Sequence, residues 1–322
     1  MTDETALLAQ AIRSGDRRAL ARGITLVESR RAEHTAAAES LLEQLLPDTG
    51  RAVRVGITGA PGVGKSTLIE TLGTRLCDRG HRVAVLAVDP SSSLSGGSIL
   101  GDKTRMEQLS RRPEAFIRPS PGGDTLGGVA RRTREAMLLC EAAGFDVVLI
   151  ETIGTGQSEV AVHGMVDLFL LLLSPAAGDE LQGIKRGVME LADAIVVHKA
   201  DGDLAPAADR TAQQCALAVR ILHPGEGTPP VLLASSTTGR GIDELWAAIE
   251  AAVARRRGDG TLAAMRTQQA TRWLDEAVRE ALQAWFLSGP DVAAKVAAAR
   301  QLVAEGKLLP TVAARRLLAA RS

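Results

Sequence analysis

The segment GAPGVGKST, Gly59 to Thr67, constrains the fold more than any other stretch of this chain. It fits the pattern G-x-x-x-x-G-K-[ST], follows a short apolar run and precedes a helical stretch. Glycines in such a loop let successive backbone N–H groups face one anion at the positive end of a helix. The sequence therefore predicts a phosphate-binding loop. Its expected ligand-contacting residues are Gly59, Ala60, Pro61, Gly62, Val63, Gly64, Lys65, Ser66 and Thr67.

Short apolar runs separated by helical stretches follow from residue 53 onward, the alternation typical of a parallel sheet covered by helices. Such runs suit strands that are buried on both faces. The expected strands are Val53–Ile57, Val83–Val88, Ala115–Arg118, Val147–Ile150, Leu168–Leu173, Ala194–Val197 and Val231–Leu233.

Helical periodicity at both ends of the chain predicts helical extensions around this α/β core. We expect an N-terminal helical extension over residues 1–50, a nucleotide-binding domain over 51–258 and a C-terminal helical segment over 259–322. Within the last segment, helices are expected near 261–287, 292–305 and 311–320.

Composition narrows the classes of partner. Lys and Arg number 38 and Asp and Glu 38, so the chain lacks the broad positive field that non-specific binding to nucleic acid or an anionic membrane requires. Aromatic residues make up only 2%, which disfavours base-stacking surfaces. The longest apolar run, Leu168–Leu173, is far shorter than the roughly 18 residues of a membrane span. We expect neither a nucleic-acid nor a membrane partner.

The three cysteines, Cys77, Cys140 and Cys215, lie far apart and form no CxxC pair. A disulfide framework or structural zinc site is therefore not expected, and we interpret them as buried apolar residues in a reducing compartment. The first residues also lack the basic and apolar pattern of a secretory signal. A cytoplasmic protein is the expectation.

Carboxylates follow two expected strands at the edge where open α/β sheets bind ligands. Asp89 ends the second strand, Asp102 lies in the Gly-rich stretch beyond it, and Glu151 ends the fourth strand. With the hydroxyl of Ser66 they are the expected Mg²⁺ ligands, because this cation prefers oxygen. A lone acid at a strand end is as often a helix cap, so the metal assignment depends on the order of these acids after the phosphate loop.

Hydrolysis of a nucleoside triphosphate needs charge neutralisation and an oriented water. Lys65 is expected to reach the terminal phosphates, with Glu151 and Asp102 acting beside it. Gly154 stands where a loop senses the γ-phosphate, and Gln157 is the candidate for orienting water, or else a solvated loop residue. No arginine is evidently placed as a catalytic finger, so slow intrinsic turnover is expected.

The run HKAD, His198 to Asp201, follows the sixth expected strand and is close to the NKxD pattern by which GTPases read guanine. A carboxylate at Asp201 can accept the guanine N1–H and N2–H together, a pair that adenine does not offer. The stem of Lys199 would lie along the base, and His198 replaces the usual Asn, which alters its contact. Ser235, Ser236 and Thr237, after the last strand, are expected to bring a backbone N–H to the guanine oxygen.

Together these motifs resemble the methylmalonyl-CoA mutase-associated G proteins of the MeaB/ArgK type. The resemblance covers at least Gly15 to Asp203 and is carried by GDRRALARGITLVES, GAPGVGKST, VDPSSS, GGSILGDKTRM, FIRPSPGGDTLGGVARRTRE, ETIGTGQSE and HKADGD. It implies a P-loop NTPase fold of the SIMIBI kind and a GTPase that binds Mg²⁺ and GTP or GDP. It also implies a homodimer formed through the C-terminal helices.

The resemblance further implies a partner, an adenosylcobalamin-dependent acyl-CoA mutase, whose cofactor loading and protection or reactivation the G protein gates. Carried over to matching positions, Lys65 and Ser66 bind phosphate and Mg²⁺, and Asp201 reads guanine. Asp89, Asp102 and Glu151 serve the metal and the switch regions, expected over Asp89–Arg105 and Thr152–Glu159. The mutase is expected to accelerate hydrolysis.

Three side-chain clusters have open interpretations. Arg131, Arg132 and Arg134 are interpreted as a solvated helix face rather than a site for a phosphate or an acidic partner. Arg255 to Arg257 is interpreted as a basic helix C-terminus. Trp273, Trp285 and Phe286 are consistent with an oligomer interface or with ordinary core contacts.

Three other functions compete. A P-loop kinase for a small molecule or protein would need an acceptor-binding lobe, which the sequence does not evidently provide. A G protein that inserts nickel would need a Cys/His cluster near the phosphate loop, which is absent from the sequence. In a nucleotide-dependent scaffold, hydrolysis would be incidental.

Overall fold

The computed structural model describes residues 2–29, 31–88, 106–119, 126–152, 158–175, 186–223, 228–289 and 291–319. The chain divides into two compact units, Met1–Arg266 and Thr267–Ser322. The N-terminal helices belong to the first unit, because they share a hydrophobic core with the sheet.

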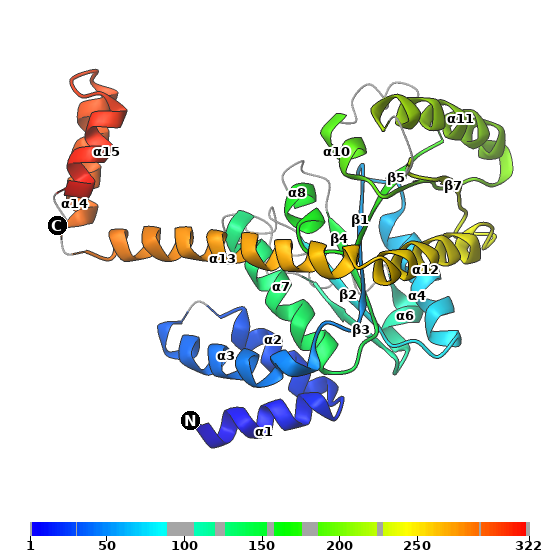
Figure 1. Ribbon diagram of the computed structural model, residues 1–322, viewed down its shortest axis with the longest axis horizontal. Coiled ribbons are helices and arrows are strands. Elements are labelled where there is room, and N and C mark those ends of the chain that lie inside the picture. Colours follow the sequence, from blue (N-terminus) through cyan, green and yellow to red (C-terminus); the bar gives the residue numbers. More distant parts are fainter. Residues whose placement is uncertain are drawn as a thin grey trace. The chain divides into compact units, whose positions relative to one another are not determined.

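A seven-stranded parallel sheet forms the centre of the first unit, in the order β3-β2-β4-β1-β5-β6-β7 (Figure 1). Its strands are β1 Val53–Gly59, β2 Val83–Val88, β3 Ala115–Arg118, β4 Val147–Thr152, β5 Leu168–Leu173, β6 Ala194–Val197 and β7 Val231–Leu233. All seven expected strands are confirmed, and β1 and β4 each continue two residues further than expected. The expected α/β fold class is likewise confirmed.

Helices cover both faces of this sheet. Those of the first unit are α1 Thr2–Arg13, α2 Arg17–Val27, α3 Ala32–Leu45, α4 Lys65–Asp78, α6 Glu107–Arg111, α7 Leu126–Ala142, α8 Ser158–His163, α10 Arg186–Leu191, α11 Ala205–Leu222 and α12 Ile242–Gly258, with the short 3₁₀ turns η1 Leu46–Asp48 and η2 Gly202–Leu204.

Alternation along β5 shows how the two faces are filled. Phe169 belongs to a hydrophobic cluster that includes residues of α1, α2, α3, α7 and α8, whereas Leu168 and Leu170 belong to a cluster with residues of α4, α6 and α12. Leu171 contributes to a third cluster with α10 and α11. Because successive side chains of a strand point to opposite faces, an uninterrupted apolar run is what a doubly covered strand requires.

The arginines of α7 correct one expectation. Arg132 and Arg134 are only 8% and 5% exposed, so they do not form a solvated face, although the side chain of Arg131 is 44% exposed. The reason is that α7 contacts α2, α3 and α8, which cover it on more than one side. By contrast, Arg255, Arg256 and Arg257 lie in the last turn of α12, as expected.

The second unit contains the remainder of α13 Thr261–Leu287, followed by α14 Val292–Ala304 and α15 Pro310–Ala319, close to the expected helices. Apolar side chains on α13, Leu274, Val278 and Leu282, are 63%, 48% and 58% exposed. Their spacing of four residues places them along one side of the helix. None of the helices in the described ranges is long and apolar enough to cross a lipid bilayer.

Candidate nucleotide-binding site

The phosphate loop joins the carboxyl end of β1 to the start of α4, at the centre of the sheet. Gly64 precedes the helix in a left-handed conformation, with φ of 101°. A Cβ at this position would lie 2.6 Å from Nδ1 of His198, so both the backbone angle and the neighbouring ring require glycine. The first turn of α4 leaves free N–H groups beside the loop, an arrangement that can bind phosphate.

Lys65 lies folded against this loop. Its Nζ donates hydrogen bonds to the carbonyl oxygens of Gly59 at 2.7 Å and Ala60 at 3.1 Å, and the residue is only 7% exposed. Burial lowers the pKa of Lys65, although the charges of Glu151 and Glu159 act in the opposite direction. A buried ammonium held by neutral carbonyls can exchange them for phosphate oxygens at little structural cost.

Ser66 and Glu151 meet beside the loop. Ser66 Oγ donates to Glu151, at 3.0 Å from Oε1 and 3.3 Å from Oε2. Strand register explains the meeting, because β4 pairs with β1 and places Glu151 opposite Ile57. This pair of a hydroxyl and a carboxylate supplies the oxygen donors that Mg²⁺ prefers, so the residues fit the expected cation.

Several expected residues cannot be placed. Asp89, Asp102, Gly154 and Gln157 lie outside the described residues. Of the phosphate-loop residues, Val63 is buried, whereas Pro61, Gly62 and Thr67 are exposed.

Sequence reasoning also missed a buried hydrogen bond of 2.8 Å from Thr152 Oγ1 to Thr58 Oγ1, which ties the ends of β4 and β1 together. The available signal was that each residue is a polar one at the end of an apolar strand.

His198 connects the phosphate loop to two other loops at the same edge. Its Nδ1 lies 3.0 Å from the carbonyl oxygen of Val63, and its Nε2 lies 2.8 Å from Ser236 Oγ. A carbonyl only accepts, so Nδ1 carries the proton in this contact and a neutral ring accepts from Ser236 through Nε2. Burial lowers the pKa of His198, and Lys199 acts in the same direction, while the bond to Val63 and the charge of Asp201 oppose it.

The remaining guanine-loop residues also contact one another. Lys199, at a φ of 58°, donates from Nζ to the Gly62 carbonyl oxygen at 2.8 Å. Ser235 Oγ donates to Oδ2 of Asp201 and accepts from the amide of Thr238 at 3.1 Å. These bonds hold the Asp201 carboxylate at the mouth of the loop, where it can accept hydrogen bonds from a base.

The contribution of the Ser235–Thr237 segment differs from the expectation in one respect. The Ser235 amide donates to the carbonyl oxygen of Arg240 at 2.9 Å, so it is not the N–H that would reach a guanine oxygen. Ser235 and Ser236 instead act through their hydroxyls, on Asp201 and His198. Thr237 is exposed and makes no side-chain hydrogen bond within the described part of the chain.

Known proteins share both the motifs and the fold. Residues 20–291 match the family described as "Methylmalonyl Co-A mutase-associated GTPase MeaB". A Caulobacter vibrioides protein that carries a GTPase name is 59% identical over 309 residues, 95% of this chain and 94% of its own. The Mus musculus "Methylmalonic aciduria type A homolog, mitochondrial" is 46% identical over 318 residues, 95% of this chain and 77% of its own. A solved structure described as a LAO/AO transport system kinase is 38% identical with a TM-score of 0.78, covering 97% of this chain and 96% of that one.

Proposed function

The chain belongs to the MeaB family of methylmalonyl-CoA mutase-associated GTPases, and on that premise we propose that this GTPase is a cytoplasmic chaperone of an adenosylcobalamin-dependent acyl-CoA mutase. In this role it gates cofactor loading and the protection or reactivation of the mutase. The family match carries the proposal, because it runs over residues 20–291 and so includes most of α2 and all of α3 and α13 besides the nucleotide-binding motifs.

Phosphate binding and hydrolysis are assigned to the loop and the acids beside it. Backbone amides of residues 59–67 and the ammonium of Lys65 hold the phosphates, and Asp201 accepts hydrogen bonds from guanine while Lys199 lies along the base. Mg²⁺, when bound by Ser66 with Glu151, Asp89 and Asp102, neutralises charge on the phosphate oxygens. Gln157 is proposed to orient the attacking water.

Communication with the mutase is proposed to pass through the connection between β4 and α8. Residues on both sides of this connection act on Lys65. Burial lowers the pKa of Lys65, and the charges of Glu151 in β4 and Glu159 in α8 each oppose that shift. Glu159 is 4% exposed and Ser158 is fully buried, so a partner that repositions α8 also changes the surroundings of the phosphate loop. The partner would thereby distinguish GTP from GDP and accelerate a slow intrinsic reaction.

A homodimer through the C-terminal helices is part of the proposal. The exposed stripe of Leu274, Val278 and Leu282 on α13 supports it, because contiguous apolar side chains in water favour association. Light scattering after chromatography tests it with Val278→Lys, which should convert dimer to monomer. A monomeric wild-type chain at micromolar concentration would remove this part of the proposal.

The decisive experiment measures phosphate release from GTP in single turnovers, with and without candidate acyl-CoA mutases, and uses Lys65→Ala as the inactive control. We expect slow release that one mutase accelerates, and tighter mutase binding to one nucleotide state than to the other. Labelled GTP and ATP with added acceptors test the kinase alternative in the same assay. Rapid turnover unaffected by every mutase, or transfer of label to an acceptor, would contradict the proposal.

A further inference from the structure

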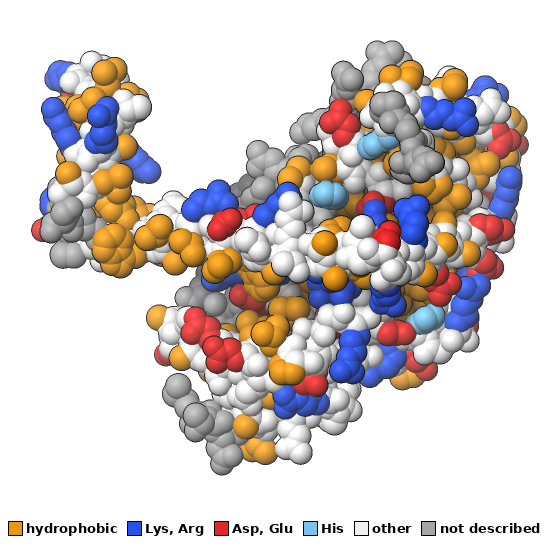
Figure 2. All heavy atoms as spheres, viewed as in Figure 1, with side chains coloured by type: hydrophobic (Ala, Val, Ile, Leu, Met, Phe, Trp, Pro, Cys, Tyr) orange, Lys and Arg blue, Asp and Glu red, His pale blue; other side chains and the backbone are white. Residues whose placement is uncertain are grey.

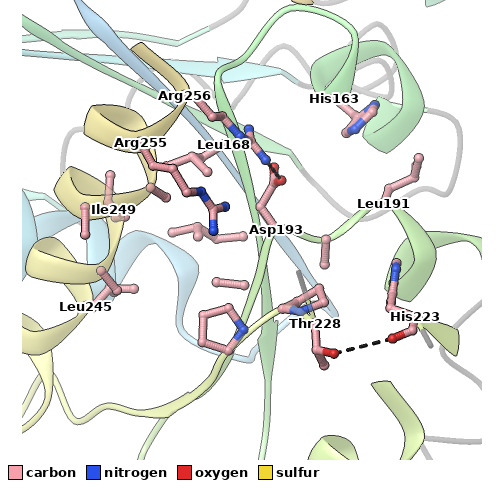
Figure 3. Close-up of a pocket in the computed structure, with 18 of the residues that line it drawn as sticks. His163, Leu168, Leu191, Asp193, His223, Thr228, Leu245, Ile249, Arg255 and Arg256 are labelled. Atoms are coloured by element: carbon pink, nitrogen blue, oxygen red, sulfur yellow. Dashed lines mark hydrogen bonds and ion pairs between the residues drawn. The ribbon is translucent and has the colours of Figure 1, made fainter. Parts of the chain in front are cut away.

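A cavity lies at the opposite edge of the sheet from the phosphate loop. It has a volume of about 550 Å³ and is lined at the amino ends of β5 and β6, with α12 forming one side (Figure 3). Leu168 of β5 lines it, whereas Leu172, four residues later, pairs with Gly59 at the phosphate loop. Leu170, two residues before Leu172, also lines the cavity, so at about 3.3 Å per residue the strand separates the cavity lining from the phosphate loop by about 7 Å or more.

The floor of this cavity is apolar. Leu168 and Leu170 of β5, Leu245 and Ile249 of α12, and Pro230 before β7 contribute to it. A cavity of several hundred Å³ has the size typical of small-molecule sites, and Glu190, Asp193, Arg255 and Arg256 line it beside the apolar residues. The polar groups then determine which ligand fits.

Two arginines line the cavity, and their surroundings differ. Arg256 pairs with Asp193 and also donates to the carbonyl oxygen of Asp167. Arg255, one residue earlier, points into the cavity in Figure 3, and within the described ranges its side chain forms no hydrogen bond or ion pair, including with the lining acids Asp193 and Glu190. Hydrogen bonds from Thr261 lower the pKa of Asp259, and the positive charge of Arg255 acts in the same direction. The Asp259 carboxylate already has Thr261 as its hydrogen-bond partner. Arg255 is exposed, so its guanidinium is open to a ligand that enters the cavity.

A second polar group is also left over. His223 lines the cavity on the side across from α12, and its Nε2 is buried with no hydrogen-bond partner among the described residues. Buried polar atoms are nearly always satisfied, and one left over next to a cavity indicates a missing partner. Arg255 and His223 thus stand on either side of an apolar floor.

We propose that this cavity binds a small organic carboxylate with an apolar body. The carboxylate accepts hydrogen bonds from the Arg255 guanidinium, whose planar fork matches two oxygens. The apolar body lies over Leu168, Leu170 and Ile249. The site is distinct from the nucleotide site and does not depend on the function proposed above.

Ligand-observed NMR titration of the full chain saturated with GDP tests this site, with phenylbutyrate as the probe and phenylbutanol as its uncharged analogue. For a ligand of this size we expect a Kd for phenylbutyrate of about 1 mM. Phenylbutanol should bind at least about tenfold more weakly, because it lacks the charged partner for Arg255.

Variants assign the binding to the cavity. Arg255→Ala should weaken phenylbutyrate at least about tenfold and leave phenylbutanol unchanged. The matched control is Arg257→Ala, on the same turn of α12, whose side chain donates to the Arg51 carbonyl oxygen outside the cavity and whose loss should change neither probe. Ala252→Trp should fill the cavity and abolish both, with retained GDP affinity reporting a folded chain. If Ala252→Trp fails to fold, Arg255→Glu decides instead, because Arg255 is exposed. This variant should lose binding of phenylbutyrate and keep binding of phenylbutanol.

Three results would overturn the proposal. One is no saturable binding of phenylbutyrate to the wild-type chain at about 20 mM, well above the expected Kd. Another is equal binding of acid and alcohol that Arg255→Ala does not alter. The last is binding of the probe to the GDP-free chain that is lost when the chain is saturated with GDP, which would place the probe in the nucleotide site.

Discussion

Buried charges lie at both edges of the β-sheet, and their partners differ between the edges. At the amino edge, Asp167 accepts from Arg266 at 2.7 and 2.8 Å and from the amide of Arg54 at 2.9 Å. The Arg54 side chain in turn donates to Glu141 at 2.6 and 3.0 Å. At the carboxyl edge, Lys65 donates to two neutral carbonyls instead.

This difference separates a structural role from a ligand-binding one. Opposite charges at the amino edge neutralise each other and join the start of β1, the end of α7 and the start of α13, so no further group is needed. A buried ammonium that donates its hydrogen bonds to carbonyls, with Glu151 and Glu159 acting through their charge, is less well compensated than an ion pair and gains from an incoming anion. Arg255 differs from both kinds of buried charge, because it is exposed and its side chain has no hydrogen-bond or ion-pair partner among the described residues, and it carries the ligand site proposed above.

The largest expected effect is that of Lys65→Ala. Removing the ammonium takes away charge neutralisation of the phosphates, so single-turnover GTP hydrolysis should fall by about 10²- to 10³-fold. Stability should change little, because the substitution removes a desolvated buried charge together with its two hydrogen bonds. Phosphate release and thermal unfolding measure the two quantities. If Lys65→Ala hydrolysed GTP normally or failed to fold, the ligand-binding role assigned to the carboxyl edge would be wrong.

Asp167→Ala should have the opposite profile. It leaves the Arg266 charge uncompensated, and breaking a buried pair in this way costs about 3–5 kcal/mol of unfolding free energy. Urea denaturation measures this loss, while GTP hydrolysis per folded molecule should remain normal. The control is Asp243→Ala, because Asp243 also pairs with two arginines, Arg75 and Arg79, but its side chain is 52% exposed. Its loss should cost less than about 1 kcal/mol, and equal losses for the two variants would contradict the comparison.

The carboxyl edge could be predicted from the sequence much better than the amino edge. Its main residues stand in short motifs directly after buried strands, and parallel strands bring such ends together. Asp167 and Arg266 lie 99 residues apart and Arg54 and Glu141 87 apart, in segments without any motif. Nothing local to these residues indicates a partner, so only the strand order and the course of α13 reveal the network.

Side-chain burial was the other feature that could not be predicted from the sequence. The arginines of α7 look like a solvated face because their spacing cannot show that α2, α3 and α8 cover the helix. Similarly, HKAD predicted a guanine loop, but the partners of His198, Val63 and Ser236, lie 135 and 38 residues away. Periodicity identifies elements, whereas contacts between loops depend on tertiary placement.

A smaller effect is expected from Gly64→Ala, which tests the contact between the phosphate loop and the guanine loop. The added Cβ meets the His198 ring and strains a left-handed backbone, so GDP affinity should fall by about 10- to 100-fold, the equivalent of 1–3 kcal/mol of strain. Gly80 is the matched control, with φ of +88° and open space around a Cβ. Gly80→Ala should lower stability by about 1 kcal/mol without changing GDP affinity. Equal GDP affinity in both variants would mean that the ring contact is unimportant.

The smallest effect concerns the titration of His198. Burial lowers the pKa of His198 in the folded chain, so the unfolded chain binds its proton at a higher pH than the folded chain does. The contribution of neutral His198 to the unfolding free energy is therefore complete above about pH 6.5. It declines as the pH falls below that value, by at most about 1.4 kcal/mol per pH unit. His198→Asn retains an amide donor for the Val63 carbonyl but does not titrate. Urea denaturation from about pH 7.5 to about 5.5 should then show wild-type stability falling more steeply than that of the variant, while parallel curves would show that the ring is not held neutral. Because the amino-edge carboxylates are common to both proteins, their titration cancels in the difference, which isolates the carboxyl edge.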